Sequence, residues 1–254
     1  MRIRILGCSG GACDDLRTTA LLLDQATLID CGTGVGDLTL EQMAGIRHVF
    51  LTHSHLDHVL FLPLLSDAAL TLRNGSLTVH ALPETIAALR AHLLNGVLWP
   101  DYANLPTPDN PYIRFEPVAV GTPIRFDNFR ITPLPALHTV PAVGYLIENS
   151  HGSFAFSGDT TYCEAFWDAL NRADRLKYVM VETTMRDTDH AVAECSRHTT
   201  PSLLAHGMAR LRQPAHLLIT HIEPDKVAEV RAEIRAALGN TPVHFLQRGE
   251  EFDL

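Results

Sequence analysis

The segment at residues 51–64, LTHSHLDHVLFLPL, places three histidines and an aspartate within six positions. An apolar strand-like run precedes this cluster and a helix-like run follows it. Because side chains alternate along an extended chain, His53 and His55 can face one point, while Asp57 and His58 come together where the helix starts. Imidazole and carboxylate groups suit zinc and comparable transition metals. Four such ligands cannot easily converge on one tetrahedral ion, so we predict two neighbouring ions; a surface loop that happens to be rich in histidine is the alternative.

More ligands are expected at the ends of other strands, because a site built on a scaffold collects residues from several elements. Three polar residues follow apolar runs in this way: His138 after ITPLPAL, Asp159 after SFAFSG and His221 after HLLIT. With the first cluster they make seven ligands, and a bridging Asp159 gives each ion four. The other histidines show no such placement, and we expect them on the surface or paired with ordinary polar partners.

The composition limits the classes of protein to which this chain can belong. Of 254 residues, 46% are hydrophobic and 19% are charged, and no window approaches the roughly 18 apolar residues of a membrane span. We therefore expect a soluble cytoplasmic protein without membrane contact, with one domain over residues 1–254. The net charge of −9 disfavours a long nucleic acid and favours a small substrate. The five cysteines form no CxxC pair, so we expect reduced thiols.

Short β-rich runs and helical patterns follow one another differently in the two halves of the chain. Strands in the first half follow one another like antiparallel hairpins, and strands and helices alternate in the second half. Two sheets packed face to face with helices outside, an α/β four-layer αββα sandwich, would accommodate both. Helical patterns lie at 56–70, 84–94, 161–172, 200–212 and 224–237. The strand runs are IRIL, TALLL, ATLIDCG, HVFLTH, LTVHAL, FRITPL, VGYLIE, SFAFSGD, KYVMVET and HLLITH.

Two loops could take part in function. Segment 96–111, GVLWPDYANLPTPDNP, is expected to form an ordered functional loop or lid. Its Trp99 and Tyr102 could stack on a purine or anchor the loop, and we favour packing. The glycine-rich turn at 7–15, GCSGGACDD, could bring backbone amides close to a ligand or simply connect two strands.

Four segments, in this order and at this spacing, resemble the metallo-β-lactamase superfamily of dinuclear metallohydrolases: THSHLDH, PLPALHTVPAVGY, FSGDT and LLITHIEP. The likeness extends over nearly the whole chain. Within that superfamily, further segments are similar to class II cyclic-nucleotide phosphodiesterases: ILGCSGGACDDLRTTALLLDQATLIDCGTG, the leucine of HSHLDH, NGVLWPDY, VETT and RHTTP. The resemblance implies a sandwich of the metallo-β-lactamase type. It also implies a homodimer, which this family often forms.

Carried over to this sequence, the resemblance implies one group of ligands for each ion and one bridging residue: His53, His55 and His138; Asp57, His58 and His221; and Asp159. The expected cofactors are two divalent ions, zinc by preference, with manganese or iron(II) as alternatives because the same ligands suit them. Such ions would lower the pKa of bound water, so that a hydroxide between them could attack phosphorus.

A proton for the leaving oxygen must come from another group. In similar phosphodiesterases and their tRNA-processing relatives, a glutamate and a histidine form a hydrogen-bonded pair beside the metals. Glu182, in KYVMVETT, and His198, in SRHTTP, stand at these two places. We expect His198 to act as general acid or phosphate contact, oriented by Glu182, with Asp57 as a further catalytic residue. The alternative is a helix-proximal histidine and an unrelated strand-end carboxylate.

These expectations favour a metal-dependent phosphodiesterase whose substrate is a small anionic phosphodiester. The leading hypothesis is a 3',5'-cyclic nucleotide, cAMP or cGMP, cleaved to the 5'-monophosphate. A tRNA 3'-processing endonuclease is an alternative, although the acidic chain lacks a long basic arm to hold tRNA. Another small phosphodiester, a lactone or thioester substrate, or a non-catalytic metal-binding module are further alternatives.

Overall fold

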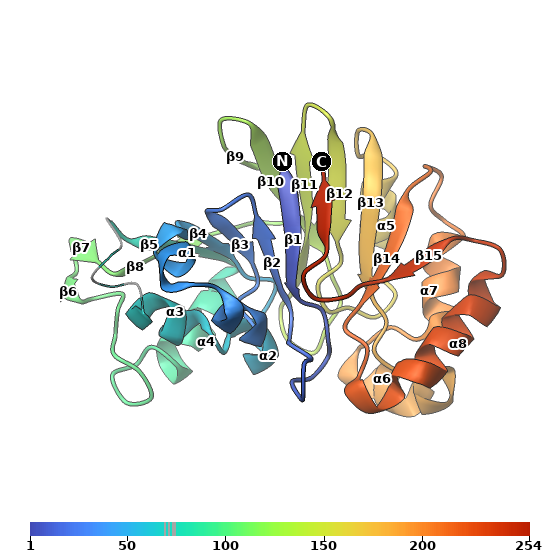
Figure 1. The fold of residues 1–254 in the computed structure, drawn as a ribbon, viewed down its shortest axis with the longest axis horizontal. Coiled ribbons are helices and arrows are strands. Elements are labelled where there is room, and N and C mark those ends of the chain that lie inside the picture. Colours follow the sequence, from blue (N-terminus) through green and yellow to red (C-terminus); the bar gives the residue numbers. More distant parts are fainter. Residues whose placement is uncertain (69, 71, 73–74) are drawn as a thin grey trace.

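The structure is a computed structural model that describes residues 1–68, 70, 72 and 75–254. Two large sheets lie face to face in the middle of the molecule (Figure 1). Helices α1 to α4 cover the outer face of one sheet, and α5, α7 and α8 cover the outer face of the other. This arrangement confirms the predicted four-layer αββα sandwich.

Within the described residues, each large sheet has seven strands, and both sheets follow the same pattern. Three antiparallel pairings along the sheet are followed by three parallel ones. The first sheet, in spatial order, contains β16 (Glu251–Asp253), β1 (Arg2–Gly7), β2 (Ala20–Leu23), β3 (Thr27–Ile29), β4 (His48–Phe50), β5 (Leu77–Ala81) and β8 (Ile113–Pro117). The second contains β15 (Val243–Phe245), β14 (His216–Thr220), β13 (Leu176–Glu182), β12 (Gly152–Phe156), β11 (Val143–Asn149), β10 (Phe129–Pro135) and β9 (Ile124–Arg125). A small hairpin joins β6 (Pro106–Thr107) to β7 (Asn110–Pro111).

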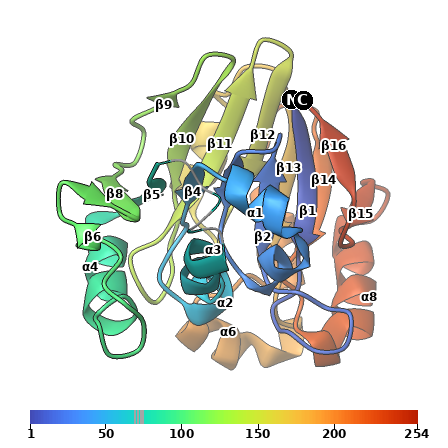
Figure 2. The same cartoon turned by 60° about the vertical axis from the view of Figure 1, so that its left-hand side comes forward.

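The helices lie between these strands in the sequence. The α-helices are α1 (Leu40–Gly45), α2 (Leu56–Val59), α3 (Leu62–Ala68), α4 (Pro83–His92), α5 (Glu164–Leu170), α6 (His190–Ser196), α7 (Pro201–Met208) and α8 (Val227–Leu238). Short 3-10 helices are η1 (Thr33–Asp37), η2 (Asp187–Asp189) and η3 (Pro224–Lys226). Turned by 60°, the molecule shows α2 and α6 at the same lower edge and the two chain ends together at the upper edge (Figure 2).

Three apolar layers hold the sandwich together. The layer between the sheets contains fully buried side chains from both, such as Phe50, Tyr145 and Phe154. Separate layers join each sheet to its own helices. Burial of apolar surface on both faces explains why the strand runs read as continuous hydrophobic stretches.

The expectation of hairpins in the first half and of strand–helix alternation in the second half is only partly right. β3, β4, β5 and β8 pair in parallel in the first half, while β10, β11 and β12 form antiparallel pairs in the second. Both halves of the chain therefore contain antiparallel and parallel strand pairings. The consequence for function is that each sheet presents the carboxyl ends of parallel strands at one edge, where ligands commonly bind.

The helix expected over 56–70 is divided into α2 and α3, and residue 69 lies outside the described residues. Pro63 explains the break, because proline has no amide hydrogen and its ring clashes with the carbonyl four residues earlier. The amide of Phe61 donates instead to the carbonyl of Cys31 at 2.9 Å. This turn leaves α2 a separate short helix that begins directly after His55 and contains Asp57 and His58.

The loop at 96–111 is tied to the first sheet's helices by its aromatic residues. Tyr102 is 5% exposed, and its hydroxyl donates to Asp67 of α3 at 2.6 Å. Trp99 packs against the same apolar layer. The favoured packing role of both residues is therefore confirmed.

No helix in the described part of the chain is long and apolar enough to span a membrane. Among the described residues, no disulfide bond joins any of the five cysteines. The single domain over residues 1–254 and the cytoplasmic location stay predictions.

Candidate metal centre

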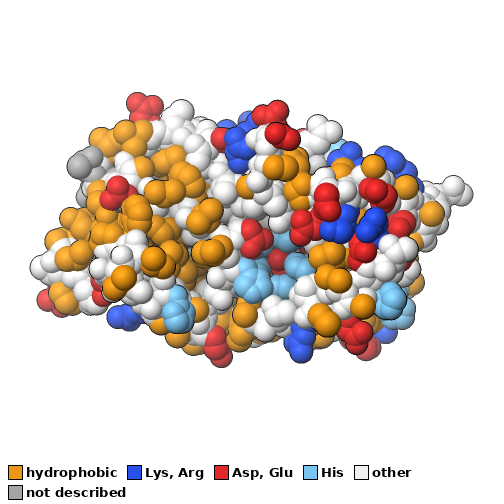
Figure 3. Space-filling model, turned by 90° about the horizontal axis from the view of Figure 1, so that it is seen from below, with side chains coloured by type: hydrophobic (Ala, Val, Ile, Leu, Met, Phe, Trp, Pro, Cys, Tyr) orange, Lys and Arg blue, Asp and Glu red, His pale blue; other side chains and the backbone are white. Residues whose placement is uncertain are grey.

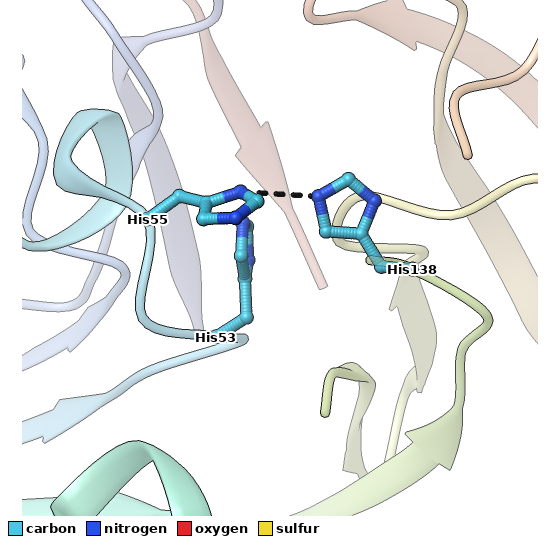
Figure 4. A group of neighbouring side chains, drawn as sticks. All are labelled: His53, His55 and His138. Atoms are coloured by element: carbon cyan, nitrogen blue, oxygen red, sulfur yellow. Dashed lines mark hydrogen bonds between the residues drawn. The ribbon is translucent and has the colours of Figure 1, made fainter. Parts of the chain in front are cut away.

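Three histidines from distant parts of the chain form a first group (Figure 4). His53 and His55 lie in the loop between β4 and α2, and His138 follows β10. Nδ1 of His55 lies 3.1 Å from Nε2 of His138, and the ring centroid of His53 lies 4.6 Å and 4.9 Å from those two rings. Nε2 of His53 is buried without a hydrogen-bond partner. A buried imidazole nitrogen that faces two other rings in this way fits a bound cation.

Four more residues form a second group beside the first: Asp57, His58, Asp159 and His221. Oδ2 of Asp57 lies 3.2 Å from Nε2 of His58 and 3.1 Å from Nε2 of His221. Oδ2 of Asp159 lies 3.2 Å and 3.3 Å from the same two nitrogen atoms. Two carboxylates and two imidazoles facing one point are a donor set for a divalent transition metal.

Asp159 lies between the two groups. Its Oδ2 is 3.7 Å from Nε2 of His53 in the first group and 3.2 Å from Nε2 of His58 in the second. Its Oδ1 is buried and has no hydrogen-bond partner. The structure thus brings all seven predicted ligands together and places Asp159 where a bridging carboxylate would stand. Their role as metal ligands stays a prediction.

The topology explains how residues so far apart in sequence meet. β4, β12 and β14 run in the parallel part of their sheets, and His53, Asp159 and His221 follow their carboxyl ends. β10 has the same direction as β12, since both pair antiparallel with β11, so His138 emerges at this edge as well.

The glycine-rich turn packs against one of these residues. His221 has a φ of 62°, and the amide of Gly10 donates to the carbonyl of Ile222 at 3.1 Å. A Cβ on Gly10 would lie 3.2 Å from Nδ1 of His221. A side chain at position 10 would crowd the carbonyl and the imidazole of His221, so glycine is favoured here.

A buried carboxylate that the sequence analysis did not single out holds two of the histidines. Asp30 follows β3 and is fully buried, with Oδ2 2.7 Å from Nδ1 of His58. Asp30 also accepts from the hydroxyl of Thr52 at 2.9 Å, and that oxygen lies 3.0 Å from Nδ1 of His53. Because the Nδ1 atoms are used as donors here, Nε2 of each ring is left to face the cluster.

A second buried carboxylate repeats this arrangement on the other sheet. Glu182 ends β13, and its Oε1 lies 2.8 Å from Nδ1 of His198. Its Oε2 accepts from the hydroxyl of Thr184 at 2.9 Å, and that oxygen lies 3.0 Å from Nδ1 of His221. Two backbone amides also donate to Oε1. Each sheet therefore supplies one carboxylate that reaches one histidine directly and another through a threonine.

His198 lies beside both groups. Its ring centroid is 5.4 Å from that of His221 and 5.0 Å from that of His138. One of its nitrogens lies close enough to His138 and Asp159 to share an ion with them, so the geometry allows either a ligand or a proton donor. Burial opposes protonation of His198, but Glu182 raises the pKa of this imidazole to about 9.

The charges of the second group favour a cation. Burial alone would lower the pKa of His58, but the carboxylates of Asp159 and Asp30 raise it well above its ordinary value. Burial would likewise raise the pKa of Asp159, but His221 and His58 hold it well below its usual range. Burial lowers the pKa of His53, which keeps this imidazole neutral, the form that binds metals.

From below, histidine and acidic side chains gather at the middle of the surface (Figure 3). Apolar side chains cover most of the surface on one side of them. The exposed apolar residues of α2, α3, the turn between them and the loop after α4 include Leu56, Leu60, Leu64, Val97 and Leu98. The candidate metal centre therefore opens to solvent next to an extended apolar face.

A family model described as the beta-lactamase superfamily domain matches residues 26–244. The chain belongs to this superfamily. The matched range contains all seven predicted ligands and the Glu182–His198 pair. The resemblance drawn from the sequence motifs is therefore confirmed.

Individual known proteins match this chain at sequence identities of 25%, 38% and 16%. A ribonuclease Z of Prochlorococcus marinus is 25% identical, with 88% of each chain covered. The 3',5'-cyclic-nucleotide phosphodiesterase 1 of Saccharomyces cerevisiae is 38% identical over 64 residues, which are 25% of this chain and 17% of that one. The crystal structure of unliganded yeast PDE1 superposes with a TM-score of 0.82 at 16% identity, covering 100% of this chain and 99% of that chain. At this identity, the structural likeness concerns the fold.

Proposed function

We propose that this superfamily member is a two-metal phosphodiesterase that cleaves 3',5'-cyclic nucleotides, cAMP or cGMP, to 5'-monophosphates. The observation that carries the proposal is the contact of His198 with Glu182, at 2.8 Å, directly beside the two ligand groups. A hydroxide alone would serve ester or lactone hydrolysis. A positioned proton donor suits the departure of an alkoxide from phosphorus.

The donors fit two divalent ions. His53, His55 and His138 would hold one ion, and the second group would hold the other through two imidazoles and carboxylate oxygens. Zinc is the first choice for such a mixed set, and manganese or iron(II) would also be accommodated. When bound, the ions would supply Lewis acidity and an activated water.

The protein's own residues would complete the reaction. His198 would give its Nε2 proton to the 3' oxygen as the phosphorus–oxygen bond breaks, while its Nδ1–H keeps its hydrogen bond to Oε1 of Glu182. Glu182 is fully buried and so fixes the orientation of the ring. The side chain of Asp57 is 31% exposed, so water can reach its carboxylate beside the second ligand group. We therefore keep Asp57, Glu182 and His198 as the catalytic set.

The relatives confirm the expected enzyme class. Ribonuclease Z and cyclic-nucleotide phosphodiesterase both break phosphodiester bonds with water, and a solved structure of similar fold is named as a diphosphatase. All three names describe hydrolysis at phosphorus. We therefore take a metal-dependent phosphodiester hydrolase as the enzyme class, and the cyclic nucleotide is the specific part of our proposal.

A substrate panel on protein of measured metal content tests it. The panel holds cAMP, cGMP, a linear dinucleotide, precursor tRNA and a lactone. We expect release of a 5'-monophosphate from at least one cyclic nucleotide, at a kcat/KM well above that for the other substrates. Intact cyclic nucleotides together with turnover of another substrate would overturn the proposal.

A ribonuclease Z activity is the second candidate, because the similarity to that enzyme spans 88% of both chains. The net charge of −9 argues against it, since tRNA binding depends on clustered cationic side chains. Cleavage of precursor tRNA in the same panel, with salt-sensitive tRNA binding in a gel shift, would reverse the order of the two candidates.

We also propose a homodimer formed through the apolar face beside the site. Leu60 and Leu64 are 44% and 42% exposed, and few charges interrupt this face (Figure 3). Two copies of an acidic chain repel each other least where charge is sparse, and exposed apolar patches of this kind mark interfaces. Light scattering after gel filtration should give twice the chain mass, and Leu64→Glu should shift it toward one chain mass. A wild-type protein of single-chain mass would refute the dimer.

A further inference from the structure

Arg197 lies next to the proton-donor candidate and contacts a predicted metal ligand twice. Its Nη1 donates to the carbonyl oxygen of His138 at 2.9 Å. In return, Nδ1 of His138 lies 3.3 Å from the carbonyl oxygen of Arg197. Arg197 therefore holds both the backbone and the ring of His138.

The backbone of Arg197 is in a conformation that favours glycine. The residue ends α6 with φ 55° and ψ 45°, in the left-handed region. Helices commonly end in this conformation, but usually with glycine, because a Cβ makes it unfavourable. An arginine at this point is disfavoured locally, and its side chain makes a hydrogen bond to His138 that glycine could not make.

The side chain is exposed, yet its hydrogen bond goes to His138. No ion pair of Arg197 with a carboxylate occurs among the described residues. Immobilising a long exposed side chain costs conformational entropy. The contact with His138 is the feature that could offset this cost.

We propose that Arg197 is a positioning residue for His138. Its carbonyl oxygen accepts a hydrogen bond from Nδ1 of His138, which leaves the Nε2 lone pair facing His53 and His55. Its guanidinium donates to the backbone of His138 and so fixes the loop that carries this residue. Outer partners that orient a ligand commonly change metal affinity ten- to a hundredfold. The variants below keep the backbone carbonyl at position 197 and remove the guanidinium contact with the carbonyl of His138. The inference rests on the proposed function, since it takes His138 to be a metal ligand.

The chain offers a matched control. Arg175 also has a positive φ, 47°, and its Nη1 also donates to a backbone carbonyl, that of Ser150, at 2.8 Å. It precedes β13, about 20 Å from the Glu182 end of that strand at the usual rise per residue. Arg175→Gly therefore removes the same backbone strain and the same kind of hydrogen bond away from the site.

The test compares Arg197→Gly, Arg197→Asn and Arg175→Gly with the wild type. Unfolding midpoints are measured without metal, metal affinity by competition with a chromophoric chelator, and coordination by the visible spectrum of cobalt-loaded protein. Both glycine variants should keep or raise the midpoint. Only the Arg197 variants should bind one of the two ions about tenfold or more weakly and show a changed cobalt spectrum. Arg197→Asn, which tolerates the left-handed region, carries the test if the glycine variant does not fold.

Wild-type affinity for both ions and an unchanged cobalt spectrum in the Arg197 variants would overturn the proposal. So would equal weakening of both ions together with a lowered midpoint, which would indicate general loss of structure. A wild-type protein that binds no ions would instead refute the proposed function, so the two failures are distinguishable.

Discussion

Nδ1 of His58 lies 2.7 Å from Oδ2 of Asp30, and both side chains are fully buried. A buried carboxylate that accepts from an imidazole orients the ring and raises its basicity as a ligand. Asp30 thereby determines which nitrogen of His58 faces the cluster.

Asp30→Asn keeps the size of the side chain and removes its charge. We expect the affinity for the ion held by His58 to fall about ten- to a hundredfold, measured by chelator competition. Asp24→Asn, an exposed change in the turn between β2 and β3, should leave affinity unchanged. Unaltered binding of both ions by Asp30→Asn would show that Asp30 does not support the site.

The hydroxyl of Thr184 joins Glu182 to His221. Thr184→Val keeps the shape and removes the link, which leaves Nδ1 of His221 without this acceptor. We expect kcat/KM to fall tenfold or more, with near wild-type activity in Thr184→Ser. The neighbouring Thr183 is a matched control, because its buried hydroxyl has no partner and Thr183→Val should be neutral or stabilising. Equal effects of the two valine substitutions would contradict the role of the link.

A proton donor matters most when the leaving group is a poor one. His198→Ala should lower kcat on a cyclic nucleotide by about a hundredfold or more. On a 4-nitrophenyl phosphodiester, whose leaving group needs no proton, the loss should be much smaller. His206→Ala, an exposed histidine on α7, serves as the control. A similar loss on both substrates would assign His198 to metal or phosphate binding instead.

His80 should make stability depend on pH. The side chain is 7% exposed and its ring stacks on Phe50, with centroids 4.2 Å apart. Burial, with the nearby His48, lowers the pKa of His80 from 6.5 to about 4. Between these values the unfolded chain binds a proton that the folded chain does not bind. Stability is therefore lost as pH falls, by about 2–3 kcal/mol at pH 4.5 from this group alone.

Urea unfolding of the wild type and of His80→Phe at pH 7 and pH 4.5 measures this contribution. The free energy of unfolding should fall less steeply with acid in the variant, whereas His151→Gln, at an exposed histidine, should follow the wild type. Parallel pH profiles of His80→Phe and the wild type would refute the prediction.

The sequence could predict what depends on local patterns. The spacing of His53, His55, Asp57 and His58 and the strand-end positions of the other ligands located the candidate centre, and apolar runs located the main strands. The capping-box pair Thr39 and Gln42 of α1 was a local feature too, and could have predicted that helix.

The amino-acid sequence could not predict the hydrogen bonds that join distant segments. Asp30 follows an apolar strand as Asp159 does, so the rule that ligands stand at strand ends could have selected it. Its partner His58 is 28 residues away, and no local pattern links the two residues. Thr52 and Thr184 are common residue types whose hydroxyls gain a role only when both sheets are in place. The left-handed backbone of Arg197 has no sequence signature, because arginine gives no hint of a positive φ.

The most direct test of the central claim is anomalous diffraction from crystals of the metal-loaded protein, recorded at the absorption edge of the metal found by elemental analysis. We predict two peaks about 3.5–4 Å apart, the usual spacing of two-metal sites. One should contact His53, His55 and His138, the other Asp57, His58 and His221, and both should contact Asp159. A single peak, or peaks away from these side chains, would contradict the account.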